Sequence, residues 1–279
     1  MMTILRCYHA LTTLCLTVSL LSVTAVRAEE PVASSAPAVP HLVWCLDHFP
    51  RFHHYDDVAE PYGPSVDVMQ ELAKRAGFKL VFAPRTATAR CIRLIADGQA
   101  DLMSNLKYSA ERDAVMQLLP YNQTVPESLF FRAADNRQMS QEQQLSQLTL
   151  VRIRGYMYSA GVMSFFQRHP RQTVEVDSIE AGLEMVLRSR VDALISPTIS
   201  TSVAIDSVSS YQQKFRRAEL NINRSENVYI HIGLSRRSPH AAMEPLLRQH
   251  LNEMIADGTV ERLYAAPTRP PQLAPTVNL

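Results

Sequence analysis

Glycine and tryptophan are scarce in this chain, whose 279 residues include 8 glycines and 1 tryptophan. The sequence contains no glycine-rich phosphate loop and no dinucleotide-binding fingerprint, so no nucleotide or other cofactor is expected. An excess of charge is also lacking, because 28 Lys and Arg stand against 27 Asp and Glu. This near-neutrality argues against nucleic acid or an anionic membrane as the main partner.

The first 28 residues have the features of a secretory signal peptide. Arg6 precedes an apolar stretch from Ala10 to Val26, and small residues at Val26 and Ala28 offer a cleavage site. The stretch is short for a membrane-spanning helix. Cleavage would remove two arginines and no acids, leaving 26 basic against 27 acidic residues and a net charge of about −1. We therefore expect an exported, periplasmic protein, with an uncleaved membrane anchor as the alternative.

Cysteine is rare beyond this segment. Of the 4 cysteines in the chain, Cys45 and Cys91 follow the expected cleavage site. An even pair in an oxidising compartment favours a disulfide. Cys45 lies on the first expected strand and Cys91 near the start of the second expected helix, so both can approach the same sheet edge. We expect a Cys45–Cys91 disulfide, with two separately buried thiols as the alternative.

A group of histidines and acids follows the first expected strand, at His48, His53, His54, Asp56 and Asp57. Its spacing matches no established zinc pattern, so no metal site is expected. The aromatic residues of the same loop, Phe49 among them, either cover a ligand or pack the loop.

The spacing of apolar residues predicts two units in which strands and helices alternate. The linker before them is rich in Pro, Ala and Ser (29–40), and a proline-rich, disordered tail follows them (267–279). The first unit is expected to have strands at 41–46, 79–82 and 102–104 and helices at 66–77 and 88–96. The second is expected to have strands at 148–153, 173–176 and 191–196 and helices at 159–168 and 179–188. Such β-α-β-α-β order predicts parallel sheets with right-handed crossovers.

The third strand of the first unit opens into a polar loop. After Asp101 and two apolar residues, the chain continues Ser104-Asn105-Leu106-Lys107-Tyr108-Ser109 and then reaches Arg112. In open α/β sheets, ligands lie beyond such strand ends. A guanidinium there offers a planar fork of donors that suits a carboxylate. The pattern predicts capture of a small anionic or zwitterionic solute.

Four sequence motifs occur in a characteristic order: Tyr62–Val68, Asp97–Asp101, Ser109–Arg112 with Leu119-Pro120-Tyr121 behind it, and Met254–Thr259. In this order they resemble the bacterial extracellular solute-binding proteins of family 3, which are periplasmic receptors for polar amino acids and related solutes.

The resemblance implies an α/β, two-lobed periplasmic-binding-protein-like (type II) fold. Each lobe is then a mostly parallel sheet flanked by helices, and two crossing strands form the hinge, near Leu129–Arg132 and Tyr229–Gly233. Lobe 1 is expected to comprise residues 41–130 plus 231–266, and lobe 2 residues 131–230.

The resemblance also implies binding residues in the first lobe. Arg112 matches the family's carboxylate-binding arginine, and Ser104, Asn105, Lys107 and Ser109 lie in the loop before it. Lys107 departs from the small hydroxyl residues that the family often has there. It adds a second cation, which suggests a more acidic ligand.

In the second lobe, Arg154-Gly155-Tyr156 and Tyr158 lie between a strand end and a helix start. Backbone N–H groups there can bind an anion, and the aromatic rings can wall a side chain. Further along, Ser196 and Thr198 flank Pro197, where amino-acid receptors of the family usually have the acid that holds the ligand ammonium. Either another acid, such as Asp47, takes that role, or the ligand is not an ordinary amino acid.

The implied function is reversible capture of a small polar, carboxylate-bearing solute for an ABC-type transporter, without chemistry. The expected partners are the solute and an ABC permease or sensor in the inner membrane, and we expect a monomer. Two alternatives stay open. One is a sensory or orphan receptor, and the other is an enzyme of the cyclohexadienyl dehydratase type. For the enzyme, Glu111 and Glu127 are the available acids, but the chain has no nucleophile–base motif.

Overall fold

The computed structural model describes residues 38–55, 60–124, 126–139, 142–218 and 229–266. The expected signal peptide, most of the linker, Asp56, Asp57 and the tail lie outside these residues. None of the described helices combines the length and hydropathy that a membrane crossing needs.

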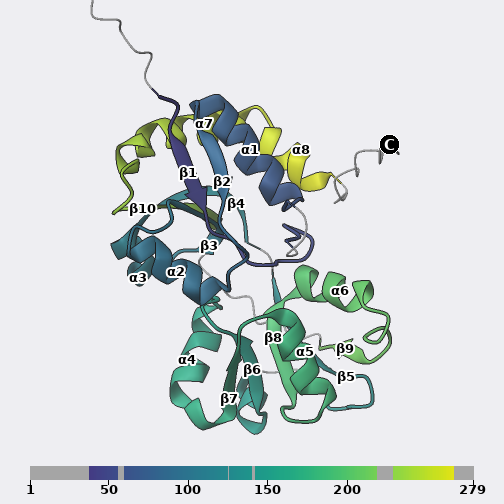
Figure 1. Cartoon of the computed structure of the whole chain (residues 1–279). Coiled ribbons are helices and arrows are strands. Elements are labelled where there is room, and N and C mark those ends of the chain that lie inside the picture. The colour runs from purple at the N-terminus through teal and green to yellow at the C-terminus, as the bar shows by residue number, and fades with distance from the viewer. Residues whose placement is uncertain (1–37, 56–59, 125, 140–141, 219–228, 267–279) are drawn as a thin grey trace, which may run out of the picture. The chain divides into compact units, whose positions relative to one another are not determined.

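The first sheet has five strands in the order β2-β1-β3-β10-β4. Their bounds are β1 His41–Trp44, β2 Lys79–Phe82, β3 Leu102–Lys107, β4 Met116–Gln123 and β10 Tyr229–Ser235. The strands β2 and β3 run parallel to β1, whereas β10 runs antiparallel to β3 and β4. Figure 1 shows this sheet with its helices, which are α1 Pro64–Ala76, α2 Thr88–Ala96, α3 Ala110–Val115, α7 Glu244–Ala256 and α8 Thr259–Ala265.

Two apolar clusters cover this sheet. Leu72 of α1 and Leu251 of α7 pack with Trp44 and the other residues of one cluster. Ile95 of α2 packs with Met116 and the disulfide cysteines in the other. The sheet is therefore covered on both sides, as parallel strands with helical crossovers require.

The second sheet also has five strands, in the order β7-β6-β8-β5-β9. Their bounds are β5 Glu127–Arg132, β6 Leu150–Ile153, β7 Thr173–Val176, β8 Ala193–Pro197 and β9 Phe215–Arg217. Strands β7 and β8 run parallel to β6, and β5 runs antiparallel to β8 and β9. The helices of this lobe are α4 Ala160–Arg168, α5 Ile179–Leu187 and α6 Thr198–Ser207. Short 3₁₀ turns occur at η1 Glu142–Gln147, η2 Pro170–Gln172 and η3 Ala241–Met243.

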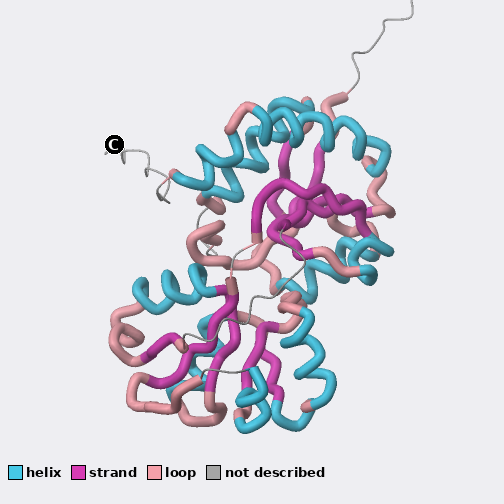
Figure 2. Tube along the Cα trace, turned by 180° about the vertical axis from the view of Figure 1, so that it is seen from behind, coloured by secondary structure: helices cyan, strands magenta, loops and turns pink. Residues whose placement is uncertain are grey.

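The two sheets share no strand, and Figure 2 shows them as two separate groups of strands flanked by helices. The predicted two-lobed α/β fold is thus confirmed. Both sheets are mixed rather than mostly parallel, because β10 and β5 enter them in the antiparallel sense.

The chain passes from the first sheet to the second between Gln123 and Glu127. All of β5 pairs within the second sheet, so the passage lies a few residues before the expected boundary at residue 130. On the return, β10 begins at Tyr229 and pairs with β3 and β4 of the first sheet.

Local sequence accounts for the helices that hold the site. Helix α1 buries Val68, Met69 and Leu72 on one side and ends at Gly77, whose φ of 72° fits the left-handed C-cap. The short helix α3 begins after Ser109, whose hydroxyl accepts a hydrogen bond from the Arg112 N–H. This cap fixes where the side chain of Arg112 leaves the loop.

Candidate ligand-binding site

A cavity is lined by residues of both lobes. Its volume is about 70 Å³, several times the roughly 10–15 Å³ that one water needs by the same measure. Most of the predicted site residues line it: Asp47, Phe49, Ser104, Asn105, Lys107, Arg112, Tyr156 and Tyr158. Its size suits a small solute.

Arg112 is buried at this cavity, with 6% of its surface exposed. Its guanidinium donates to the Lys107 carbonyl and to the Gly155 carbonyl, both at 2.7 Å. Gly155 belongs to the second lobe, so the arginine connects the two lobes. Burial lowers the pKa of Arg112 to about 10, against a smaller opposite effect of the Glu111 carboxylate. Among the described residues no carboxylate forms an ion pair with Arg112, so its charge is met only by neutral oxygens.

Lys107 has a different environment. Its ammonium forms an ion pair with the Glu127 carboxylate, and the exposed fractions of the two side chains are 12% and 2%. The second Glu127 oxygen accepts from the Ser159 N–H at 3.2 Å. Lys107 ends β3 of the first sheet and Glu127 begins β5 of the second. The second cation of the predicted site is therefore already matched by an acid from the other lobe.

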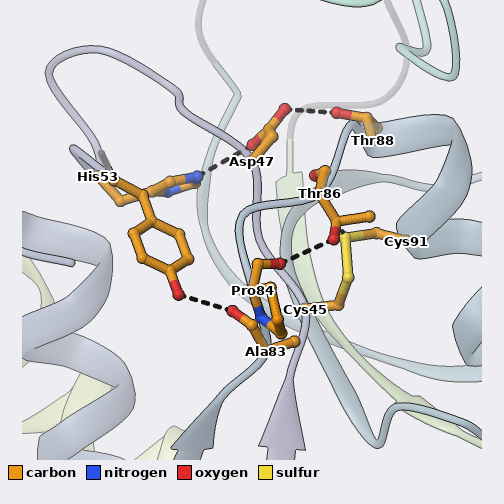
Figure 3. Close-up of a disulfide and its surroundings, with 9 residues drawn as sticks. Cys45, Asp47, His53, Ala83, Pro84, Thr86, Thr88 and Cys91 are labelled. Atoms are coloured by element: carbon orange, nitrogen blue, oxygen red, sulfur yellow. Dashed lines mark hydrogen bonds and ion pairs between the residues drawn. A yellow bond between two sulfur atoms is a disulfide. The ribbon is translucent and has the colours of Figure 1, made fainter. Parts of the chain in front are cut away.

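Asp47 lies at the cavity beside the disulfide, as Figure 3 shows. It accepts from His53 Nε2 at 3.0 Å, from Thr88 Oγ1 at 2.5 Å and from the Tyr156 hydroxyl at 3.4 Å. Burial raises the pKa of Asp47, but the hydrogen bonds and charge of His53 and the Thr88 hydroxyl outweigh it, so the net pKa lies below its ordinary value. The aspartate is thus held as an anion.

His53 is buried between Asp47 and Asn105. The Asn105 amide nitrogen lies 3.4 Å from His53 Nδ1, and His53 Nε2 lies 3.0 Å from Asp47. An amide NH₂ donates, so Nδ1 accepts and Nε2 carries the proton. The two ring nitrogens of His53 therefore connect the Asn105 amide to the Asp47 carboxylate.

Asn105 lines the cavity but is held by its own lobe. It has a left-handed φ of 57°, a conformation that asparagine tolerates better than most residues. Its amide donates to Ser65 Oγ at 2.9 Å, and its Oδ1 accepts from the hydroxyls of Tyr121 and Tyr264 at 2.9 and 3.2 Å. Asn105 therefore shapes the cavity wall.

Aromatic rings form another part of the wall. Phe49 and Phe52 stack with centroids 5.1 Å apart, and Phe49 meets Tyr156 of the second lobe edge-on at 5.8 Å. The packing of these rings supports the interpretation as loop packing. Both phenylalanines also line the cavity, and their covering a ligand stays a prediction.

The remaining predicted residues lie elsewhere. Ser109 and Gly155 line a second, larger hollow, which Arg112 also lines. Arg154 is half-exposed and forms ion pairs with Glu175 and Asp177. Thr198 shares a 2.7 Å hydrogen bond with Ser128.

Ser196 is fully buried in β8, and its hydroxyl has no hydrogen-bond partner among the described residues. Its neighbour Pro197 lines the cavity instead. The strand explains the difference, because successive side chains point to opposite faces of a sheet.

Several residues that line the cavity were not among the predicted binding residues: His53, Thr88, Glu127, Met157 and Pro197. Phe52 lines it as well and is one of the loop aromatics for which ligand cover was one interpretation. The sequence pointed to His53 only as part of a histidine group without a zinc pattern, and to Glu127 only as an available acid for an enzyme. Neither pattern indicated the partners that the two residues have. Within the described residues no cluster of three or more His, Cys, Asp or Glu is placed to hold a metal ion.

The expected disulfide joins Cys45 and Cys91, with Cα atoms 5.6 Å apart. Both residues are fully buried. The bridge connects the segment that carries Asp47 with the helix that carries Thr88, whose side chains hydrogen-bond to each other (Figure 3).

The sequence model of the bacterial extracellular solute-binding proteins, family 3, matches residues 42–266. The chain belongs to this family. No curated protein matches the chain. The match confirms the family that the four motifs predicted. The architecture of two mixed sheets agrees with this family.

Solved structures share the family fold. An ancestral arginine-binding protein bound to arginine is 17% identical with a TM-score of 0.68, covering 80% of this chain and 96% of that one. An arginine 3rd transport system periplasmic binding protein from Legionella pneumophila is 18% identical with a TM-score of 0.66, covering 81% and 98%. A histidine kinase sensor domain with similarity to periplasmic binding proteins is 14% identical with a TM-score of 0.67, covering 84% and 98%. At these identities the likeness establishes the fold.

Proposed function

We propose that this solute-binding protein is a periplasmic receptor that captures a small amino-acid-like solute between its lobes and passes it to an ABC-type permease. The observation that carries the proposal is the environment of Arg112. A guanidinium that is buried, and met only by carbonyl oxygens among the described residues, retains a desolvation cost that an anion can offset. A ligand carboxylate offers the bidentate partner that suits this fork.

The charges that line the cavity indicate the rest of the ligand. Two cationic side chains, Arg112 and Lys107, stand against two anionic ones, Asp47 and Glu127. A zwitterion adds no net charge to this set. With its carboxylate at Arg112, its ammonium finds the Asp47 carboxylate, which replaces the acid missing at Pro197. Two of the structural neighbours are named as arginine-binding proteins, which supports an amino-acid-like guest.

The dehydratase alternative finds less support. Glu127 is engaged by Lys107 and the Ser159 N–H. Glu111 is exposed, and hydrogen bonds from its own backbone N–H and from Ser109 lower its pKa. A general acid working near neutral pH needs the opposite shift. Two engaged or ionised carboxylates fit a binding protein better than an enzyme.

Substitution of Arg112 tests the proposal. We expect Arg112→Ala to weaken binding of the tightest amino acid in a calorimetric panel by about a hundredfold or more, because losing one partner of a buried charge pair costs about 2–5 kcal/mol. Arg112→Lys keeps the charge but loses the planar fork of donors. Its affinity should lie between that of the wild type and that of Arg112→Ala.

Arg154→Ala is the matched control, because Arg154 is half-exposed and paired with acids of its own lobe. It should bind as the wild type does. Unchanged affinity in Arg112→Ala, with a melting temperature close to that of the wild type, would refute the assignment of the carboxylate to this arginine.

A further inference from the structure

The Lys107–Glu127 ion pair connects the two lobes. The two residues come from different sheets and both line the cavity. The Glu127 side chain is buried, and that of Lys107 is 12% exposed. Lys107 also accepts, through its carbonyl, one of the hydrogen bonds of the Arg112 guanidinium. The pair therefore lies next to the group to which the proposed function assigns the ligand carboxylate.

The ion pair also changes which ligands the positive charge of Lys107 can attract. An unmatched Lys107 would attract a second ligand carboxylate, as the sequence suggested. With Glu127 in contact, a second carboxylate meets a cation that is already neutralised and two fixed anions, Glu127 and Asp47. Like charges repel strongly at a site with little solvent, so Glu127 and Asp47 disfavour a ligand with a second carboxylate. Repulsion of the competing ligand is a common source of specificity.

An additional ligand cation is disfavoured by the same balance. Glu127 is occupied on one oxygen by Lys107 and on the other by the Ser159 N–H. Asp47 already accepts a hydrogen bond from His53, and in the proposed function it also binds the ligand ammonium. The uncharged wall beside these groups includes Phe49, Phe52 and Met157, which suits a side chain without charge.

We infer that the Lys107–Glu127 pair is a charge filter that makes the site select net-neutral amino acids and reject acidic and basic ones. This inference rests on the proposed function and adds the class of ligand side chain. It assigns to Lys107 and Glu127 a selectivity role that neither residue has alone.

Opposite changes in selectivity test the filter. Wild type, Glu127→Gln, Lys107→Gln and the double variant are titrated by calorimetry with the twenty amino acids, and glutamine against glutamate is the matched pair. Wild type should bind neutral amino acids most tightly. Glu127→Gln leaves Lys107 without its carboxylate, so affinity for glutamate relative to glutamine should rise by about tenfold or more.

Lys107→Gln leaves the Glu127 carboxylate in excess, so affinity for lysine and arginine relative to glutamine should rise by about tenfold. The double variant should return to a preference for neutral ligands. Glu71→Gln, which breaks an ion pair of Glu71 with Arg75 far from the cavity lining, is the control and should leave the ratios unchanged.

The outcomes separate the two proposals. A wild type that binds no amino acid would overturn the proposed function and this inference with it. A wild type that prefers acidic or basic ligands, or single variants that weaken all ligands alike without moving the ratios, would overturn only the charge filter. If the ion pair is purely structural, both single variants should weaken all ligands alike. Loss of structure does not shift selectivity toward acidic ligands in one variant and toward basic ligands in the other.

Discussion

The Cys45–Cys91 disulfide gives a stability prediction whose size follows from the chain. The cross-link spans a sequence separation of 46 residues. Closing a loop of that length in the unfolded chain removes about 13–14 cal/mol/K of entropy, which is about 4 kcal/mol at 25 °C. We therefore expect reduction of the bridge to lower the free energy of unfolding by about 4 kcal/mol.

Urea unfolding with and without a thiol-free reductant measures this difference on one and the same sequence. Trp44 is the reporter, since it is the single tryptophan of the chain, is fully buried and lies beside Cys45. The reduced chain should also show a larger dependence of stability on urea, because its unfolded state exposes more surface. A Cys45→Ala/Cys91→Ala variant should lose at least as much stability, since it also loses two buried sulfur atoms.

The same treatment should weaken ligand binding. The bridge lies beside the hydrogen bond between Asp47 and Thr88 (Figure 3). Without the bridge, the segments that carry these residues are less ordered, and ordering them when the ligand binds costs free energy. A loss of stability below about 1 kcal/mol on full reduction would refute the reasoning, because it would mean that the unfolded chain gains little freedom from the broken cross-link.

Two further predictions concern single residues. Burial lowers the pKa of His54 from 6.5 to about 4, and the charges of His48 and His53 add to this effect. The unfolded chain therefore binds a proton at His54 more readily than the folded chain does. The free energy of unfolding should fall as the pH drops from about 6.5 to about 4. His54→Gln should flatten the dependence of melting temperature on pH between 7 and 4, and a slope equal to that of the wild type would contradict this. Gly155 has a φ of +83°, and a Cβ there would lie 2.8 Å from the Ala89 nitrogen of the other lobe, so Gly155→Ala should weaken ligand binding by about tenfold or more in calorimetry. Gly77→Ala, with a φ of +72° and no atom within 4 Å of the added carbon, is the matched control and should reduce stability while leaving affinity unchanged.

The alternation of strands and helices was predictable because each element carries its own periodicity. Helix α1 shows it in Val68, Met69 and Leu72, and its end at Gly77 follows from a left-handed cap. The disulfide was predictable because two cysteines remained after the expected cleavage, one near the end of the first expected strand and one on the second expected helix, which approach the same sheet edge. In these regions the local preference and the tertiary structure agree.

Other elements were missed because the deciding contacts are distant in the chain. Strand β4 contains Pro120, which argues against a strand, yet β4 is the edge strand next to β10, where a missing N–H costs little. Helix α6 begins at Thr198 and is rich in β-branched and hydroxyl residues, which are weak helix formers. Its buried Thr201 and Ala204 show that packing against the lobe decides its structure.

The ligand position predicted from sequence, Arg112, lies at the cavity, but the meaning of Lys107 depends on a partner in the other sheet. An assignment of the ligand carboxylate to Lys107 would require the Glu127 pair to break first, and leaving one partner of a buried pair uncompensated costs about 3–5 kcal/mol. Arg112 requires no such step, because its acceptors are the neutral carbonyls of Lys107 and Gly155. Since Gly155 belongs to the second lobe, a carboxylate bound at Arg112 acts on a contact that both lobes share. Such a ligand would favour the arrangement in which the lobes meet, because it binds that arrangement more tightly. The buried charge that we propose as the ligand's partner is then the same one that links the lobes.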